Sequence, residues 1–315
     1  MKRALWLRAA VLAATAVLCS SAWNDAGDGT GEMRQVAPGV WFRQGENALG
    51  YCNNVVIEMQ DYLIVVDANY PGGAREVIAQ VPELSPKPVK YVFDTHHHRD
   101  HSYGNALWTA RGATTLAYKG VVDEMNRYEP TRWRQAATER QDVRDLGLSD
   151  AERPQQTFEK SPFVLKDETR EVRFYYLGWG HTRGDGYVWL PKERILCTGD
   201  AAVNGPYNKL LDANMANWPR VLDQAAKFAP KYVLPGHGRA GGPEVLTGQK
   251  QFLVDLYDGV KAAIAQGKTL DQIHLTLPAA DSNWVSARLL DQDVQVTYRE
   301  ITQHTPAGDI PHEWK

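Results

Sequence analysis

The 315-residue chain contains only three cysteines, which excludes a disulfide-rich scaffold. One of them lies in the first 22 residues, and the other two are Cys52 and Cys197. Each of these two lies in an apolar, strand-like stretch, so we expect buried free thiols. In an exported protein they could instead pair with each other. Neither thiol is needed as a metal ligand in the site predicted below.

The chain also lacks an uninterrupted apolar run of about 20 residues, the length that a membrane-spanning helix requires. The apolar run at residues 9–18 instead has the length of a signal-peptide core, with a positive start before it and small residues at 20–22. We predict a signal peptide over residues 1–22 and a periplasmic or secreted protein without stable membrane insertion. Lipid attachment at Cys19 is less favoured, because a bulky leucine precedes it.

No basic run, internal repeat or low-complexity tract is visible in the sequence. The formal net charge is −3, and cleavage of the predicted signal peptide removes three further positive charges. An acidic chain without a basic patch is not expected to bind nucleic acid, so we expect a small-molecule substrate. Hydrophobic residues make up 43 % of the chain, which suits a globular protein. The oligomeric state stays open.

Residues 23–33 are rich in glycine and aspartate and predict a flexible leader, and residues 34–315 can form one large domain. Strands are predicted at residues 40–42, 54–58, 62–67, 89–94, 114–118, 171–177, 187–190, 194–197 and 231–234. Helices are predicted at residues 71–84, 104–110, 121–140, 218–228, 243–266 and 269–277 and in part of the tail, with loops and short elements over 141–170. This order favours an α/β or α+β fold with outer helices. The C-terminal helices from about residue 243 could cover a substrate groove or form a dimer face.

Seven side chains with metal-binding groups follow predicted strands, each in a turn or loop. Four of them form the motif H-x-H-x-D-H, and three come later in the chain. They are His96, His98, Asp100, His101, His181, Asp200 and His237. Loops at strand ends are where a rigid scaffold usually holds functional groups. Imidazoles mixed with carboxylates suit zinc or a similar borderline ion, so we predict a metal site.

The spacing of these side chains predicts two ions. In an extended segment, residues i and i+2 point the same way, so His96 and His98 can reach one ion while His97 and Arg99 point away. The predicted assignment is His96, His98 and His181 on the first ion, and Asp100, His101 and His237 on the second. The carboxylate of Asp200 has two oxygens and can bridge both ions.

These motifs resemble those of the metallo-β-lactamase superfamily of hydrolases. The similar segments are residues 95–105 (THHHRDHSYGN), 180–182 (GHT), 199–200 (GD) and 235–238 (PGHG), and Val66-Asp67 before Gly72-Gly73 resembles an early turn of the family. The resemblance covers about residues 36–240 and implies an αββα four-layer sandwich with the metals at one edge of the two sheets. Tyr103 stands where the family usually has glycine, so we expect it to reshape the pocket beside Asp100.

Two divalent ions about 3.5–4 Å apart can hold a hydroxide and polarise a carbonyl at neutral pH. We therefore predict an exported hydrolase with two zinc ions per chain, whose metal-bound hydroxide attacks an ester, thioester, lactone or amide carbonyl. Iron and manganese are not excluded. Asp100 is the predicted catalytic residue, because it can orient the nucleophile and relay a proton.

Two other enzymatic functions stay open. The resemblance implies that β-lactamases of the family usually carry Cys or Ser where Asp200 stands, whereas glyoxalase-, lactonase- and nuclease-like members carry Asp, so a β-lactamase is the second choice. A mononuclear iron enzyme that resembles persulfide dioxygenases is the third, with the iron on His96, His181 and Asp200. Metal analysis separates one iron from two zinc ions. A metal-binding protein without catalysis is also conceivable.

Several other side chains lie near the ligands in sequence. Trp179, Asn204, Tyr207 and Asn208 could touch substrate, although packing or turn roles are favoured. Tyr128 and Trp133 could cover the mouth of the site or pack against the core. No role is assigned to His97, His274, His304 and His312, for which we expect surface or supporting positions.

Overall fold

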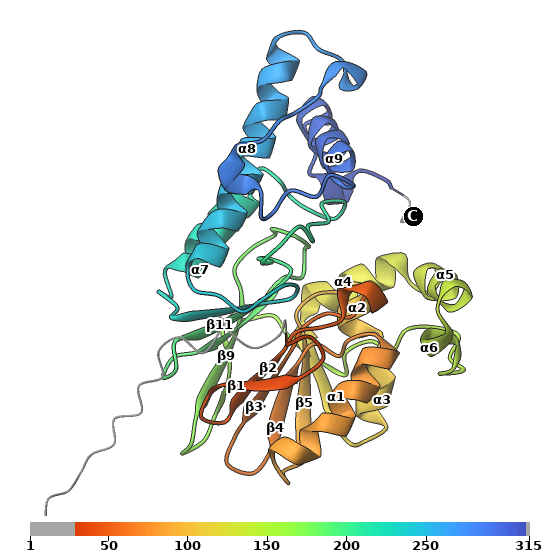
Figure 1. Ribbon diagram of the computed structural model, residues 1–315. Helices are drawn as coiled ribbons and strands as arrows, with labels where there is room; N and C mark the ends of the chain where they lie inside the picture. The colour runs from red at the N-terminus through yellow and green to blue at the C-terminus, as the bar shows by residue number, and fades with distance from the viewer. Residues whose placement is uncertain (1–28, 313–315) are drawn as a thin grey trace, which may run out of the picture.

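Two β-sheets form the centre of the computed structural model, which describes residues 29–312 (Figure 1). The seven-stranded sheet runs in the order β1 (Met33–Ala37), β2 (Val40–Arg43), β3 (Asn54–Glu58), β4 (Leu63–Val66), β5 (Val89–Asp94), β6 (Thr114–Tyr118) and β7 (Gln156–Phe158). The five-stranded sheet runs in the order β12 (Tyr232–Pro235), β11 (Ile195–Gly199), β10 (Gly186–Leu190), β9 (Glu171–Tyr176) and β8 (Phe163–Lys166). The strands from β4 to β7 are parallel, as are β11 and β12.

Apolar side chains from the inner faces of the two sheets fill the space between them. Ile57 and Phe93 come from the first sheet and pack in the same cluster as Phe174 and Val188 of the second. The rings of Phe93 and Phe174 lie 4.7 Å apart between centroids. Burial of one such side chain stabilises a fold by about 1.5–3 kcal/mol. The inner layer therefore holds the two sheets, and the loops at their edge, in a fixed arrangement.

Helices cover the outer face of each sheet (Figure 1). On the first sheet lie α1 (Pro71–Leu84) and α3 (Asn105–Thr109), and on the second lies α7 (Trp218–Ala226). The long helix α8 (Glu244–Ala265) packs on α7 and β12, and α9 (Leu290–Gln303) packs on α8. Val77 and Val81 of α1 pack against the strand residues Val65 and Val92. The result is the αββα sandwich that the family resemblance implies, so the predicted fold class is confirmed.

The prediction of one continuous helix over residues 121–140 is wrong. The structure has two helices there, α4 (Lys119–Tyr128) and α5 (Thr131–Glu139), followed by the short α6 (Gln141–Arg144). Pro130 separates them, because a proline disfavours the helical conformation of the residue before it. Glu129 accordingly has extended backbone angles, with φ −90° and ψ 150°.

The helix predicted at residues 269–277 is also wrong, since only a 3-10 turn at Leu270–Gln272 forms there. The first strand, β1, was not predicted. The backbone N–H of Gly31 donates to the carbonyl of Gln44 at 2.9 Å, so the chain is already paired with the domain just before β1. The predicted signal peptide and residues 23–28 of the predicted leader lie outside the described residues.

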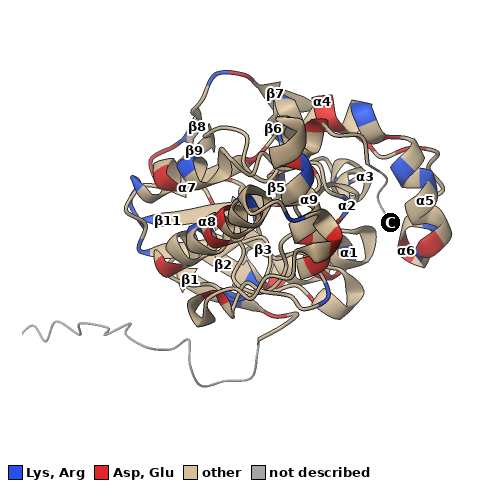
Figure 2. Ribbon diagram, turned by 90° about the horizontal axis from the view of Figure 1, so that it is seen from above, with Lys and Arg blue, Asp and Glu red and all other residues tan. Residues whose placement is uncertain are grey.

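Cys52 and Cys197 are buried free thiols, as their apolar surroundings predict. Within residues 29–312, no helix is both long and apolar enough to span a membrane. Basic and acidic side chains are interspersed over the face seen in Figure 2 and do not form a single band. Other short elements are α2 (Arg99–Ser102) and the 3-10 turns Asn47–Leu49, Ala279–Asp281 and Ala307–Asp309.

Candidate metal centre

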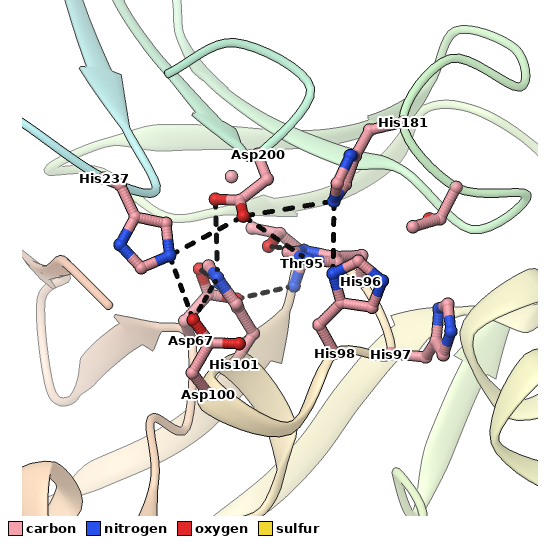
Figure 3. Close-up of polar contacts among 12 residues, drawn as sticks. Asp67, Thr95, His96, His97, His98, Asp100, His101, His181, Asp200 and His237 are labelled. Atoms are coloured by element: carbon pink, nitrogen blue, oxygen red, sulfur yellow. Dashed lines mark hydrogen bonds and ion pairs between the residues drawn. The ribbon is translucent and has the colours of Figure 1, made fainter. Parts of the chain in front are cut away.

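The seven candidate ligands come from loops that meet at one edge of the sandwich (Figure 3). The H-x-H-x-D-H motif directly follows β5 and continues into α2. His181 lies between β9 and β10, Asp200 follows β11, and His237 follows β12. Because β5, β11 and β12 all end at this edge, the structure brings side chains that are up to 141 positions apart into one group.

The first donor group consists of His96, His98, His181 and Asp200, each with one donor atom within 4.8 Å of all the others. His181 Nε2 lies 3.2 Å from His98 Nδ1. Asp200 Oδ2 lies 3.9 Å from the Nε2 atoms of both His96 and His181. All four side chains are buried. The spacing of these donor atoms leaves room for one cation among them.

The second donor group consists of Asp100, His101 and His237, also within 4.8 Å of one another. Asp100 Oδ2 lies 2.9 Å from His237 Nε2 and 3.5 Å from His101 Nε2. The remaining oxygen of Asp200, Oδ1, lies 3.4 Å from His101 Nε2. Asp200 Oδ2 also lies 3.6 Å from His237 Nε2, so this one carboxylate faces both donor groups.

Four of the five histidines are oriented through the ring nitrogen that does not face the centre. His96 Nδ1 lies 3.1 Å from Thr95 Oγ1, and His237 Nδ1 lies 3.2 Å from Asn47 Oδ1. Two carboxylates complete the set, with Asp67 Oδ2 2.8 Å from His101 Nδ1 and Asp212 Oδ2 2.9 Å from His98 Nε2. Such partners fix the ring and its tautomer in metal sites.

Asp67 and Asp212 were not recognised as supporting residues from the sequence. Asp67 directly follows β4 and has the left-handed conformation (φ 66°), which is strained for a residue other than glycine. Its Oδ1 accepts a 2.8 Å bond from the backbone N–H of Thr95 and so joins the ends of β4 and β5. Asp212 lies 114 residues from His98 in a loop, and no local motif marks it.

The protonation states of these side chains suit a cation. Burial lowers the pKa of His96 and His98 well below the usual value, and that of His181 to about 4, so these rings are neutral at pH 7. Burial opposes ionisation of Asp100 and Asp200, but the neighbouring histidines outweigh it and hold both pKa values low. Neutral imidazoles and ionised carboxylates are the forms that bind metals.

His101 differs from the other rings. Burial disfavours its charged form, yet the carboxylates of Asp200, Asp67 and Asp100 raise its pKa well above the usual value. The carboxylates around His101 thus favour a positive charge at this position, which a bound metal ion would also supply. Burial also raises the pKa of Cys52 to about 12, so this thiol is neutral and is no competing ligand at pH 7.

Three buried donor atoms at the centre have no hydrogen-bond partner among residues 29–312. They are His96 Nε2, His101 Nε2 and Asp200 Oδ1. Buried polar atoms without partners are rare in native proteins and call for a bound group. These atoms face the space between the two donor groups, so the residues present fit metal ions.

Comparison with known proteins agrees with this geometry. The family model described as "Metallo-beta-lactamase superfamily" matches residues 48–237, more than half of the chain. The chain belongs to the metallo-β-lactamase superfamily. It is similar to a metallo-beta-lactamase type 2 of Bacillus cereus, with 26 % identity over 68 % of this chain and 78 % of the relative. A metallo-beta-lactamase type 2 of Bacteroides fragilis is 40 % identical over 26 % of this chain, a match that spans only 35 % of the relative.

Solved structures of metallo-β-lactamases share the fold. The metallo-beta-lactamase from Pontibacter korlensis has a TM-score of 0.58 and 18 % identity, covering 71 % of this chain and 99 % of that one. The DIM-1 metallo-beta-lactamase has a TM-score of 0.57 and 19 % identity, covering 71 % and 96 %. The family model ends at residue 237, so α8, α9 and the tail follow the part of the chain that it matches.

In this member of the metallo-β-lactamase superfamily, a pocket of about 640 Å³ opens beside the candidate ligands. His98, Asp100, Asp200 and His237 lie in its wall. Of the four nearby side chains considered from the sequence, Tyr207 also lines it. The others have structural contacts: Trp179 Nε1 donates to the Asp212 carbonyl, Asn204 Nδ2 to the Arg239 carbonyl, and Asn208 Oδ1 accepts from Gln249.

Tyr103 does not line this pocket, although the sequence led us to expect that it reshapes it. Its side chain is 1 % exposed and packs with Trp133 in the cluster beneath α4 and α5. Its hydroxyl donates to Glu129 Oε1 at 2.6 Å. Trp133 is likewise core, while the Tyr128 hydroxyl reaches Asp212. The departure from the family glycine is therefore accommodated inside the fold.

Proposed function

We propose that the chain is a metal-dependent hydrolase with two zinc ions, which cleaves an ester, thioester, lactone or amide carbonyl. The observation that carries this proposal is the carboxylate of Asp200, whose oxygens lie within 4 Å of histidines from both donor groups. The proposed ligands are His96, His98 and His181 for the first ion, and Asp100, His101 and His237 for the second, with Asp200 between them.

When bound, a pair of divalent ions supplies a water of lowered pKa and polarises the substrate carbonyl. The protein contributes the positions around them. The Asp100 side chain is 24 % exposed and lines the pocket, so it can orient the attacking water and accept its proton. Asp67, Thr95 and Asp212 hold the histidine rings in place.

The pocket supports a substrate with an anionic group. Its cationic lining residues are Arg99, Arg132, Arg140, Lys209 and Arg288, and its acids are Asp100, Glu139 and Asp200. Two of the acids are proposed ligands, and Glu139 lies 3.5 Å from Arg99. Lys209 and Arg288 make no hydrogen bond or ion pair within residues 29–312. Cationic side chains in a cleft of an acidic protein attract anionic substrates.

A β-lactamase is the second candidate, and the names of the similar proteins support it. Against it stands Asp200, because the family resemblance places Cys or Ser at this position in β-lactamases. A single iron held by His96, His181 and Asp200 is the third candidate. Metal content separates it from the first two, since it requires one iron in place of two zinc ions.

The test is metal analysis together with hydrolysis of a chromogenic ester, a thioester, a lactone and a cephalosporin. We expect two zinc ions per chain, hydrolysis of at least one carbonyl substrate, loss of activity on chelation and recovery with zinc. Faster turnover of the cephalosporin than of the ester and lactone would favour the second candidate. Bound zinc without hydrolysis of any substrate would overturn the proposed activity.

We also propose that residues 1–22 direct export and that the mature protein is periplasmic or secreted. The supporting observation is the sequence pattern of residues 1–22. N-terminal sequencing of the protein from cell fractions tests it. A mature chain that begins after Ala22 is expected, and an intact N-terminus in the cytoplasm would contradict it.

A further inference from the structure

The tail after α9 returns to the metal centre. His312 Nε2 lies 3.1 Å from Asp212 Oδ1, and the other oxygen of Asp212 lies 2.9 Å from the ring of His98. We infer that His312 is a positioning residue, which acts through Asp212 on the proposed ligand His98. This inference rests on the proposed metal-dependent function, and it adds a residue 75 positions beyond the end of the family match.

Asp212 is fully buried, and four polar side-chain atoms lie close to its carboxylate. On Oδ2 these are His98 Nε2 at 2.9 Å and His97 Nε2 at 3.3 Å. On Oδ1 they are the Tyr128 hydroxyl at 2.9 Å and His312 Nε2 at 3.1 Å. His98 and Tyr128 form hydrogen bonds with the carboxylate, while His97 and His312 lie within ion-pair distance of it. Asp212 therefore connects His312 with His98.

Each ring nitrogen of His312 faces an acceptor oxygen. Nδ1 lies 2.9 Å from the carbonyl of Ile310, and Nε2 faces the Asp212 carboxylate. Both partners are acceptors, so a ring that carries both protons and a positive charge fits this position. His312 therefore places a cation against one oxygen of Asp212, while His98 uses the other oxygen. The charge fixes the carboxylate in the orientation that aims His98 Nδ1 at His181.

The tail is held where it can deliver this ring. The Gly308 N–H donates to the Ala213 carbonyl at 2.9 Å, next to Asp212 in sequence. The Gly308 carbonyl accepts from Arg127 of α4 at 2.8 Å, and Asp309 forms an ion pair with Arg183. These contacts tie the tail to α4 and to the loops that carry His181 and Asp212. These contacts on three sides fix the position of the tail, and with it the position of the His312 ring.

The experiment measures zinc affinity in His312→Ala, His312→Gln and Asp212→Asn by competition with a chromogenic chelator. Removal of an outer-shell partner typically weakens metal binding about 10- to 100-fold. We expect about tenfold weaker binding of one of the two zinc ions in His312→Ala, and partial rescue in His312→Gln, whose amide can still donate. His304→Ala is the matched control, because this exposed histidine lies at the end of α9 away from Asp212.

A double-mutant cycle shows whether His312 acts through Asp212. We expect His312→Ala to add little to the loss already caused by Asp212→Asn. Unchanged zinc affinity in His312→Ala, or full additivity of the two losses, would overturn the inference. Thermal unfolding of the metal-free variants checks that the fold is retained, and His312→Gln serves if His312→Ala unfolds. Failure of the unmodified protein to bind zinc would instead overturn the proposed function.

Discussion

At the scale of single residues, the metal centre depends on which ring nitrogen of each histidine faces the centre and can therefore bind a metal ion. His96, His98, His101 and His237 each engage one ring nitrogen with a protein partner and present the other to the centre. His98 presents Nδ1, whereas His96 presents Nε2. The partners thus select the donor atom, which residue type alone does not determine.

Replacement of Asp200 by alanine tests the shared carboxylate. The variant should bind about one zinc ion in place of two, because Asp200 is the acid that faces both donor groups. Hydrolysis should fall by at least 100-fold, as expected when paired ions no longer act together. Metal content and kcat check this, with the exposed Asp223→Ala as the control. Two tightly bound zinc ions in Asp200→Ala would refute the bridging role.

Replacement of Lys209 or Arg288 by methionine tests whether the pocket recognises an anionic group of the substrate. Each variant should raise KM about tenfold for 4-nitrophenyl hydrogen adipate, which ends in a carboxylate, because a cation in the pocket is lost. KM for the neutral 4-nitrophenyl hexanoate should stay unchanged. Lys166→Met, on the far strand β8, is the control. An equal effect on both esters would count against charge recognition.

Prediction from the sequence at this scale was limited by distance along the chain. The seven proposed ligands could be named because the motif places four of them within six residues and the others follow glycine-rich strand ends. Asp67 and Asp212 could not, because their partners His101 and His98 lie 34 and 114 positions away. Asp67 lies in a turn that resembles the family, but neither acid carries a local signal of its contact with a histidine.

At the scale of elements, short strands deliver the ligands, and two of them end in or directly before a glycine, β11 at Gly199 and β12 before Gly236. Gly236 follows β12, and a Cβ built on it would lie 2.1 Å from Asp200 Oδ1 and 2.7 Å from the Gly199 carbonyl carbon. Such a contact is too short for any Cβ, so only glycine allows His237 and Asp200 to approach each other. The sequence shows the glycine, but the neighbour that requires it comes from β11.

Gly236→Ala should therefore displace Asp200. We expect weaker zinc binding and at least a tenfold loss of kcat, since small misplacements in an active site are costly. The control is Gly259→Ala in the middle of α8, where alanine is the better helix former and the nearest atoms belong to the Leu275 side chain at 3.3 Å. Wild-type zinc affinity in Gly236→Ala would show that Asp200 tolerates the shift.

Helix α9 carries a buried acid whose ionisation opposes folding. Burial raises the pKa of Asp293 to about 8, against about 3.9 in an unfolded chain. The folded protein keeps a proton that the unfolded chain releases, so stability falls as pH rises from about 4 to 8. Asp293→Asn should stabilise the fold by about 1–3 kcal/mol at pH 9 and by little at pH 4.

Thermal unfolding at pH 5 and pH 9 measures this difference. Asp291→Asn, exposed in the same turn of α9, should show no such change between the two pH values. A gain in Asp293→Asn that is equal at both pH values would contradict the raised pKa.

Elements with strong local patterns could be predicted, and those that depend on tertiary contacts could not. The strands at residues 89–94 and 114–118 match the structure at both ends, because β-branched and aromatic residues fill them. The helix over 121–140 fails at Pro130, although the proline was visible in the sequence. The helix prediction for residues 269–277 fails because the apolar residues of this segment pack against the core without forming an α-helix.

At the scale of the whole molecule, both the two sheets and the C-terminal segment contribute to the site. The sheets place the ligands, while Ser286, Arg288 and Leu289, between α8 and α9, form part of the pocket wall. The tail reaches the other side of the centre at Asp212. The chain beyond the family match therefore contacts the site from two directions. The sequence predicted helices there and left open that they cover a substrate groove, but it did not point to the contact at Asp212.

Removal of metal should lower the stability of the whole domain. Ligands that bind only the folded state stabilise it by about 4 kcal/mol at 1,000 times their Kd. For a chain of this size we expect a chelator to lower Tm by roughly 5–10 °C. Differential scanning calorimetry with and without added zinc measures it, and Asp200→Ala should show a smaller shift. An unchanged Tm after chelation would mean that the domain does not depend on metal.

The most direct measurement of the central claim is a crystal structure of the zinc-loaded protein with anomalous data at the zinc edge. The account predicts two peaks about 3.5–4 Å apart. One should lie within bonding distance of His96, His98 and His181, and the other within that of Asp100, His101 and His237, both beside Asp200. A single peak, or zinc bound elsewhere with His237 turned away, would contradict it.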